Sequence, residues 1–157
     1  MEQIRSWLIY TLRCFMGIAT LVLTVVTTLQ VIARYIFSNP IAWGQDIIRL
    51  SFIYLVFLGA ALCVDKVEHL NIDVCLEMLS DQYRKVISLG IDVVLIIFYL
   101  FLLIYGYDFT VAGMNQLAPY LPIPMSIYYA AVPLSALFMA YFQFAHIVRT
   151  VKKGGDE

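Results

Sequence analysis

Charged side chains are scarce in this chain. They make up 13% of its 157 residues, while 62% of the residues are hydrophobic, and a typical soluble domain has about 25% charged residues. This shortage excludes an ordinary water-soluble domain. We therefore expect membrane lipids to surround the chain. The formal net charge of −1 leaves no excess of basic residues, so we expect no nucleic acid to bind it.

Residues that bind metals or cofactors are also few. The chain has only two histidines, His69 and His146, and its three cysteines show no C-x-x-C spacing. A membrane cytochrome with two haems needs four axial ligands, so the histidine count argues against that class. A nucleophile elbow, a phosphate-binding loop and a metal-ligand cluster are missing as well. We therefore expect no enzyme, no catalytic or substrate-binding residue, no metal site and no cofactor.

The sequence has instead four long apolar runs. Each holds 18 to 23 residues with at most one formal charge. A helix rises about 1.5 Å per residue and a bilayer core is about 30 Å thick, so each run can cross the membrane. We predict an all-α membrane protein with a single four-helix domain over residues 1–157. The predicted spans are residues 14–33, 47–64, 86–107 and 126–148.

The basic residues divide unevenly between the two ends of these spans. With the N-terminus in the cytoplasm, eight of the ten fall on the inner side, as the positive-inside rule requires. Four spans then place both termini in the cytoplasm, where the reducing compartment keeps the cysteines free of disulfides. The inner group is Arg5, Arg13, Lys66, Arg84, Lys85, Arg149, Lys152 and Lys153, and the outer pair is Arg34 and Arg49.

Small and hydroxyl-bearing side chains recur at helical spacing in the first two spans. Lipid tails give no hydrophobic drive between helices, so such faces mark close helix contacts. We favour packing within the chain's own helices over a ligand pathway. The face in the first span is Gly17, Thr20, Thr24 and Thr27, and its counterpart in the second span is Ser51 with Gly59, Ala60 and Ala61.

Two charged residues begin the second span. Asp46 and Arg49 stand three residues apart and share a helix face near the outer boundary. A charge at the centre of a membrane helix costs about 2.5–3.5 kcal/mol on insertion scales, and less near the ends. We therefore favour a paired, structural role for Asp46 and Arg49, with an ion relay as the alternative.

The third span contains a single acid, Asp92. A lone carboxylate inside a membrane should be protonated, hydrogen-bonded or turned toward protein. Thr20, Gln143 and His146 lie at similar depth on other helices. We expect Asp92 to be a buried hydrogen-bond anchor to Gln143 or Thr20, and a proton relay with His146 is the sharper alternative.

The connections between spans carry patterns of their own. Between the second and third spans, apolar and acidic residues alternate with helical period, which predicts an amphipathic helix on the inner membrane surface. The outer connection over 108–124 holds three prolines and should be stiff, and Pro133 should bend the last helix. The apolar face of the amphipathic helix is Ile72, Leu76, Leu79 and Tyr83, and the acidic face is Asp73, Glu77 and Asp81.

A resemblance to a known family is carried best by residues 33–74, ARYIFSNPIAWGQDIIRLSFIYLVFLGAALCVDKVEHLNIDV. This stretch resembles the small membrane subunit of the tripartite ATP-independent periplasmic (TRAP) transporters. The later PYLPIPMSIYYAAVP is similar to that family's proline-rich approach to its last helix. One departure is Gln45-Asp46, because the family often has two acids after the tryptophan. The matching positions are Arg34, Pro40, Trp43, Asp46, Arg49, Leu58-Gly59 and Glu68-His69.

The resemblance implies an accessory role in the bacterial inner membrane. Such a subunit would brace a larger membrane subunit that imports an organic-acid anion (a C4-dicarboxylate, sialic acid or another sugar acid) by a sodium-driven elevator mechanism. A soluble periplasmic protein would deliver the substrate and dock on the outer face. The alternatives are a small independent transporter and a membrane anchor of a redox complex. The outer residues best placed for docking are Arg34, Tyr35, Asn39, Asn115 and Gln116.

Overall fold

The computed structural model describes residues 2–39, 41–66 and 81–153, and nearly all of them are helical. Four stretches are long and apolar enough to cross a membrane, as the sequence predicted. The amphipathic helix expected between the second and third spans lies almost entirely outside the described residues. The helices are α1 (Glu2–Tyr35), α2 (Ala42–Lys66), α4 (Asp81–Ala112), the 3-10 turn η2 (Gly113–Asn115), α5 (Met125–Tyr129) and α6 (Ala131–Lys153).

The long helices extend beyond the apolar runs from which they were predicted. α1 has 34 residues and is therefore about 51 Å long, well over the thickness of a bilayer core. Its first four residues include Glu2, Gln3 and Arg5, which are good helix formers although they are polar. Apolarity marks where a helix can cross the membrane, and helix propensity lets it project beyond.

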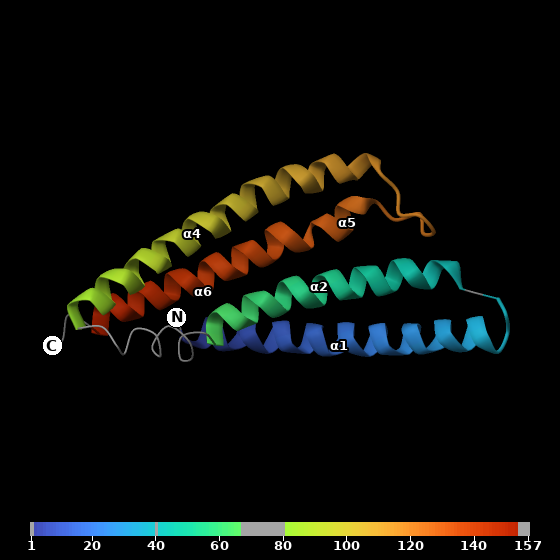
Figure 1. Ribbon diagram of the computed structural model, residues 1–157, viewed down its shortest axis with the longest axis horizontal. Helices are drawn as coiled ribbons and strands as arrows, with labels where there is room; N and C mark the ends of the chain where they lie inside the picture. The colour runs from blue at the N-terminus through green and yellow to red at the C-terminus, as the bar shows by residue number, and fades with distance from the viewer. Residues whose placement is uncertain (1, 40, 67–80, 154–157) are drawn as a thin grey trace.

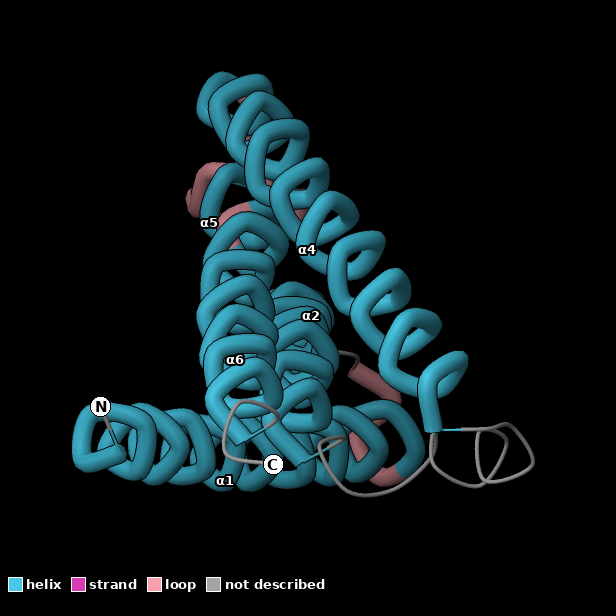
Figure 2. Tube along the Cα trace, turned by 90° about the vertical axis from the view of Figure 1, so that its left-hand side faces the viewer, coloured by secondary structure: helices cyan, strands magenta, loops and turns pink. Residues whose placement is uncertain are grey.

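The four long helices form an open row. α1 packs mainly on α2, α2 packs on α6, and α6 packs on α4, as Figure 1 shows. α1 and α4 are the two edges of the row, and Figure 2 shows them running at a steep inclination to each other on either side of α2 and α6. Both chain termini lie at one end of the row, and the 36–41 and 113–124 connections lie at the other.

The contact of α1 with α2 uses a different face from the one predicted. Gly17, Thr20, Thr24 and Thr27 are all exposed, and nothing lies within 4 Å of a Cβ placed on Gly17. The hydroxyls of Thr20 and Thr24 find their hydrogen-bond acceptors within α1, since each donates to the carbonyl four residues earlier at 2.8 Å. The covered stripe alternates at three and four residues, as in a coiled coil. It is Leu12, Met16, Ala19, Leu23, Val26, Gln30 and Ala33.

The core lies where α2 and α6 meet their neighbours. Leu12, Leu58 and Phe142 form one buried cluster, and Ala61, Tyr99 and Met139 form a second. Small residues let the backbones come close at this contact. Ala61 had been expected at such a contact and is fully buried, whereas Ala60 beside it is exposed. The fully or almost fully buried small residues of α6 are Ala131, Ser135 and Ala136.

The last span is interrupted close to Pro133, where the sequence predicted a bend. The helix is interrupted at Ala130, between α5 and α6. Pro133 has no N–H to donate to the carbonyl four residues earlier, while the neighbouring bonds Ala130 N to Ser126 O and Leu134 N to Ala130 O are kept. Beyond the interruption, α5 packs mainly on α4 and to a lesser extent on α2. Figure 1 shows α5 following on from α6 beneath the end of α4.

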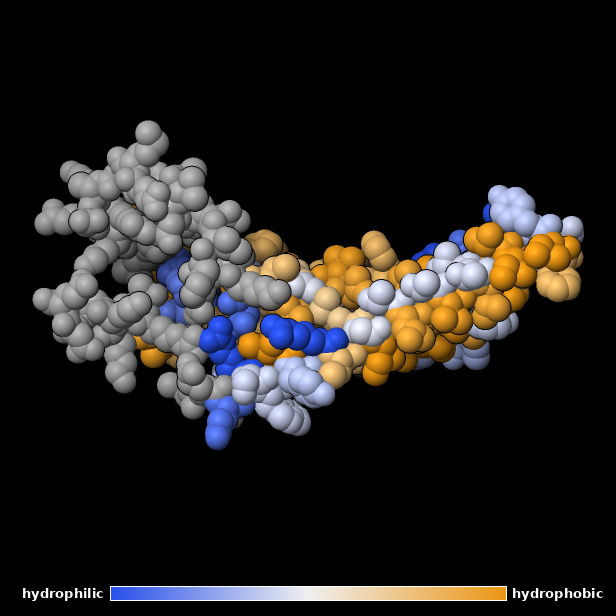
Figure 3. Space-filling view, turned by 90° about the horizontal axis from the view of Figure 1, so that it is seen from below, coloured by the Kyte–Doolittle hydropathy of each residue, from blue (hydrophilic) through white to orange (hydrophobic). Residues whose placement is uncertain are grey.

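Much of the remaining surface is apolar. Figure 3 shows hydrophobic residues over the middle of one face, with the most hydrophilic side chains gathered toward the end that holds the termini. Large apolar side chains are also exposed on the outer sides of α1 and α4, among them Ile18, Leu21, Val94 and Ile104. A surface of this kind suits lipid or another membrane protein.

Candidate functional site

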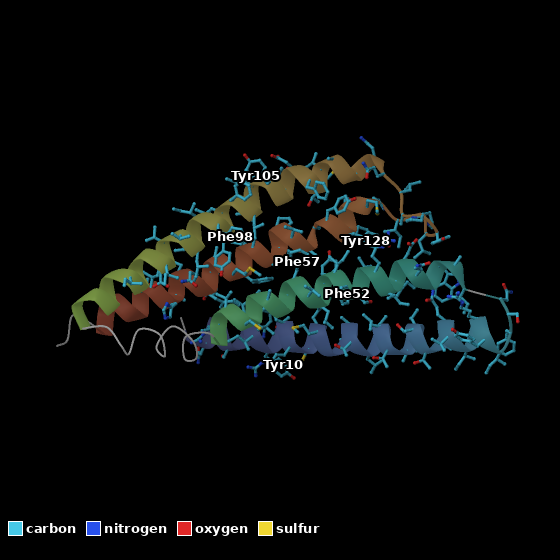
Figure 4. The ribbon with its side chains drawn as sticks, viewed as in Figure 1. Tyr10, Phe52, Phe57, Phe98, Tyr105 and Tyr128 are labelled. Carbon is cyan, nitrogen blue, oxygen red and sulfur yellow. The ribbon has the colours of Figure 1, made fainter. Side chains whose placement is uncertain are left out.

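The most constrained polar group is Asp46, near the start of α2. Its side chain is fully buried, and Oδ2 accepts hydrogen bonds from the backbone N–H groups of Tyr120 and Leu121 at 2.8 and 2.9 Å. The Tyr128 hydroxyl donates to the Asp46 carbonyl at 3.3 Å, and Figure 4 shows this ring lying between α5 and α2. Oδ1 of Asp46 has no hydrogen-bond partner among the described residues. Asp46 therefore ties the loop between α4 and α5 to α2.

The loop held by Asp46 is also closed on itself. Ala118 N donates to Ile123 O at 2.8 Å and Met125 N to Gln116 O at 2.7 Å, which gives an isolated antiparallel bridge between Leu117 and Pro124. Together with the prolines, which fix φ, these bonds restrain the backbone of the loop. The loop lies at the end of the row opposite the chain termini (Figure 1).

Arg49 does not pair with Asp46, contrary to the expectation from their spacing. Within residues 2–39, 41–66 and 81–153, no hydrogen bond or ion pair engages the Arg49 side chain, which is exposed. The reason is that the Asp46 carboxylate points away from solvent, toward the loop N–H groups.

All five residues expected to dock a soluble partner are exposed, at the end of the row opposite the chain termini. Arg34 and Tyr35 end α1, Asn39 lies in the turn that follows, and Asn115 and Gln116 begin the 113–124 connection. The structure places the two groups on separate connections at the same end of the row (Figure 1). Exposed apolar side chains accompany them, including Phe37 and Tyr120.

The turn between α1 and α2 is held from inside by Gln30. Its Nε2 donates to the carbonyl of Ile41 at 3.0 Å, and a Cβ on Gly44 would come within 2.9 Å of that nitrogen. Ser38 takes the left-handed conformation with φ of 52°. Sequence reasoning overlooked Gln30 and Tyr128. The available signals were an amide in an apolar run and a tyrosine beside the proline-rich loop.

Asp92 has one of the partners considered for it. Gln143 Nε2 donates to Asp92 Oδ1 at 2.7 Å, and both side chains are buried between α4 and α6. His146 Nδ1 lies 3.7 Å from the same oxygen. Thr20 is not involved, because it bonds within α1 and α1 does not pack on α4. The cluster joins α4 to α6.

At the end that holds the termini, Arg5 Nε is hydrogen-bonded to Asp65 Oδ1, which fastens the start of α1 to the end of α2. In the part of the chain that the structure describes, no group of three or more His, Cys, Asp or Glu residues could hold a metal ion, and Cys14 and Cys63 are free.

Comparison with known proteins gives the family. Residues 23–153 match the model of the DctQ component of tripartite ATP-independent periplasmic transporters. The chain is 24% identical to a TRAP transporter small permease protein of Haemophilus influenzae, over 80% of this chain and 76% of the relative. It is 23% identical to the sialic acid TRAP transporter small permease protein SiaQ of Vibrio cholerae, over 83% and 75%.

A third relative is the C4-dicarboxylate TRAP transporter small permease protein DctQ of Vibrio cholerae, which is 25% identical over 89% of this chain and 68% of the relative. The family match covers most of the chain, including the Asp46 and Asp92 sites. A component of a tripartite system works with other TRAP components, and it is part of a transporter rather than an enzyme. This chain therefore belongs to the DctQ family and is the small permease subunit of a TRAP transporter, a multi-pass protein of the inner membrane.

Proposed function

We propose that this subunit braces the large membrane subunit of a sodium-coupled TRAP transporter and helps to dock its periplasmic binding protein. The observation that carries the proposal is the open row of helices in a chain that belongs to the DctQ family. A row with two free edges buries little of its own apolar surface. It is suited to lie against a larger membrane protein.

The described polar groups support a bracing role. Asp46 holds the outer loop, Gln30 holds the α1–α2 turn, Asp92 and Gln143 join α4 to α6, and Arg5 is hydrogen-bonded to Asp65. Each of these contacts fixes one element of the row to another. These hydrogen-bonded groups therefore stabilise the arrangement of the helices. We assign movement of the substrate to the large subunit.

We place the termini in the cytoplasm and the 36–41 and 113–124 connections in the periplasm, in line with the distribution of basic residues. The outer end would then receive the soluble binding protein. Arg34 is exposed there, so charge reversal by Arg34→Glu should weaken docking while the two membrane subunits stay associated. Unchanged docking and unchanged uptake in this variant would refute the assignment.

We propose an organic-acid anion as the transported substrate. Relatives of this chain are named for sialic acid and for C4-dicarboxylates, and both carry ionised carboxylates near neutral pH. The residues that choose between such substrates would lie in the other subunits. Sialic acid and a C4-dicarboxylate are therefore the first probes for uptake.

The proposal is tested by co-purification followed by reconstitution. A tagged form of this chain should bring down the large subunit from membranes solubilised in mild detergent. Proteoliposomes should then take up the substrate only with a sodium gradient, both membrane subunits and the binding protein. Uptake that persists when this chain is left out would refute the bracing role.

Two other functions are separated by the same preparations. A small independent transporter would accumulate solute when this chain is reconstituted alone, and we expect no accumulation. A membrane anchor of a redox complex would purify with a haem or flavin absorption spectrum. Either result would replace the proposal.

A further inference from the structure

The exposed stripe of α2 is the feature that the functions above leave unexplained. α2 is an inner helix of the row, with α1 on one side and α6 on the other, and yet one face of it stays uncovered along its whole length. The spacing of three and four residues shows that this is a single face. Its residues are Gln45, Arg49, Phe52, Val56, Ala60 and Cys63.

Arg49 is the one charged residue of that stripe. It lies seven residues after the first residue of α2 and hence about 10 Å along the helix axis. Exposed Trp43 lies nearer the outer end, and tryptophan marks the level of the lipid headgroups. The backbone of Arg49 is therefore about 9 Å below that level. The residues that follow it on the stripe, Phe52 and Val56, are apolar.

The residues that the structure describes provide no anion for this guanidinium. The nearest carboxylate in sequence, Asp46, is buried and turned toward the N–H groups of Tyr120 and Leu121. Among the described residues no other acid bonds to Arg49. A cation in a medium of low dielectric constant needs an anion beside it, and a carboxylate matches the fork of an arginine in two parallel hydrogen bonds.

We propose that Arg49 is the polar anchor of the interface with the large membrane subunit. Its guanidinium pairs with an Asp or Glu carboxylate on a helix of that subunit, and this helix lies along the exposed stripe of α2. The inference rests on the proposed function, because it takes the large subunit as the partner. A protein carboxylate is favoured over a lipid phosphate because the backbone of Arg49 lies about 9 Å below the level of Trp43 and the lipid headgroups.

The test compares charge variants of Arg49 in the full complex. Arg49→Glu should lower the amount of large subunit that co-purifies with the tagged chain about tenfold or more, because two acids would then face each other in the interface. Arg49→Gln should give an intermediate loss, and Arg49→Lys, which keeps the charge, the smallest. A substitution of the partner acid by Arg should restore co-purification of the Arg49→Glu chain.

Arg34→Glu is the matched control. It makes the same charge change on an exposed arginine at the end of α1 and should leave co-purification unchanged. Equal recovery of the large subunit by the wild-type, Arg49→Gln and Arg49→Glu chains would overturn the inference and point to a lipid partner. Failure of the wild-type chain to recover the large subunit would refute the proposed function itself, so the two failures are distinguishable.

Discussion

At the scale of single residues, the polar groups of this chain divide by whether their own chain satisfies them. Asp46 and Asp92 are buried and hydrogen-bonded, although each is an acid in or beside a membrane span. Thr20 and Thr24 face outward at no cost because their hydroxyls bond to their own helix. Arg49 differs from all of these, since it is exposed and charged.

Removing the Asp46 carboxylate should loosen the loop between α4 and α5. Asp46→Ala leaves the N–H groups of Tyr120 and Leu121 without their acceptor, and a buried unsatisfied group costs about 1–3 kcal/mol. Hydrogen exchange of these two amides in nanodiscs should become faster. Asp108→Ala, a change at an exposed acid of α4, should leave their exchange unaltered, and equal protection in both variants would contradict the role of Asp46.

The pair of Asp92 and Gln143 should depend on hydrogen bonding and not on charge. Asp92→Asn keeps an oxygen acceptor for Gln143 Nε2, so assembly and uptake should be almost unchanged. Asp92→Leu leaves the Gln143 amide unsatisfied and should lower thermal stability by about 1–3 kcal/mol. Complete loss of uptake in a stably assembled Asp92→Asn transporter would favour the proton relay with His146 instead.

At the scale of elements, two glycines lie at close contacts with the last span, where a larger side chain would not fit. A Cβ on Gly106 of α4 would come within 3.1 Å of the Val132 and Pro133 side chains of α6. A Cβ on Gly113 would come within 2.6 Å of the Tyr129 ring. These glycines hold α4 close to the bent last span, whereas Gly17 of α1 touches nothing outside its own helix.

The helical glycines Gly106 and Gly17 make a matched pair. Gly106→Ala should lower the thermal unfolding temperature in detergent, because overpacking costs about 1–3 kcal/mol and outweighs the gain in helix propensity. Gly17→Ala should be neutral or stabilise by up to about 1 kcal/mol, since alanine is the better helix former. The same shift in both variants would show that close packing at Gly106 does not matter.

At the scale of the whole molecule, the chain forms two helical hairpins joined through α2 and α6. Both hairpins turn at the same end, opposite the chain termini (Figure 1). The two connections therefore lie together, away from the termini. The 36–41 and 113–124 connections form one end, and Arg5, Asp65 and the termini form the other.

The proposed orientation can be read from cysteine labelling in intact cells. With the termini in the cytoplasm, Cys14 and Cys63 should not react with a membrane-impermeant maleimide until the cells are lysed. A single cysteine introduced by Asn115→Cys, in a chain whose native cysteines are replaced by serine, should react at once. Labelling of the native cysteines and protection of position 115 in intact cells would reverse the orientation.

The amino-acid sequence by itself determined the membrane environment, the four spans, the family and the bend near Pro133. These follow from local properties, because apolar length, proline chemistry and residue order act within one segment. It also anticipated Gln143 as a partner of Asp92, since depth along a span can be counted from its residues.

Only the tertiary structure decided which faces meet. The threonine face of α1 was expected inside and is exposed, because a stripe of Leu, Val and Ala with a spacing of three and four residues packs on α2 better. Asp46 was expected to pair with Arg49 and instead binds backbone N–H groups that lie 74 and 75 residues away in sequence. Contacts over such distances depend on how the hairpins dock, and no local pattern of residues carries that information.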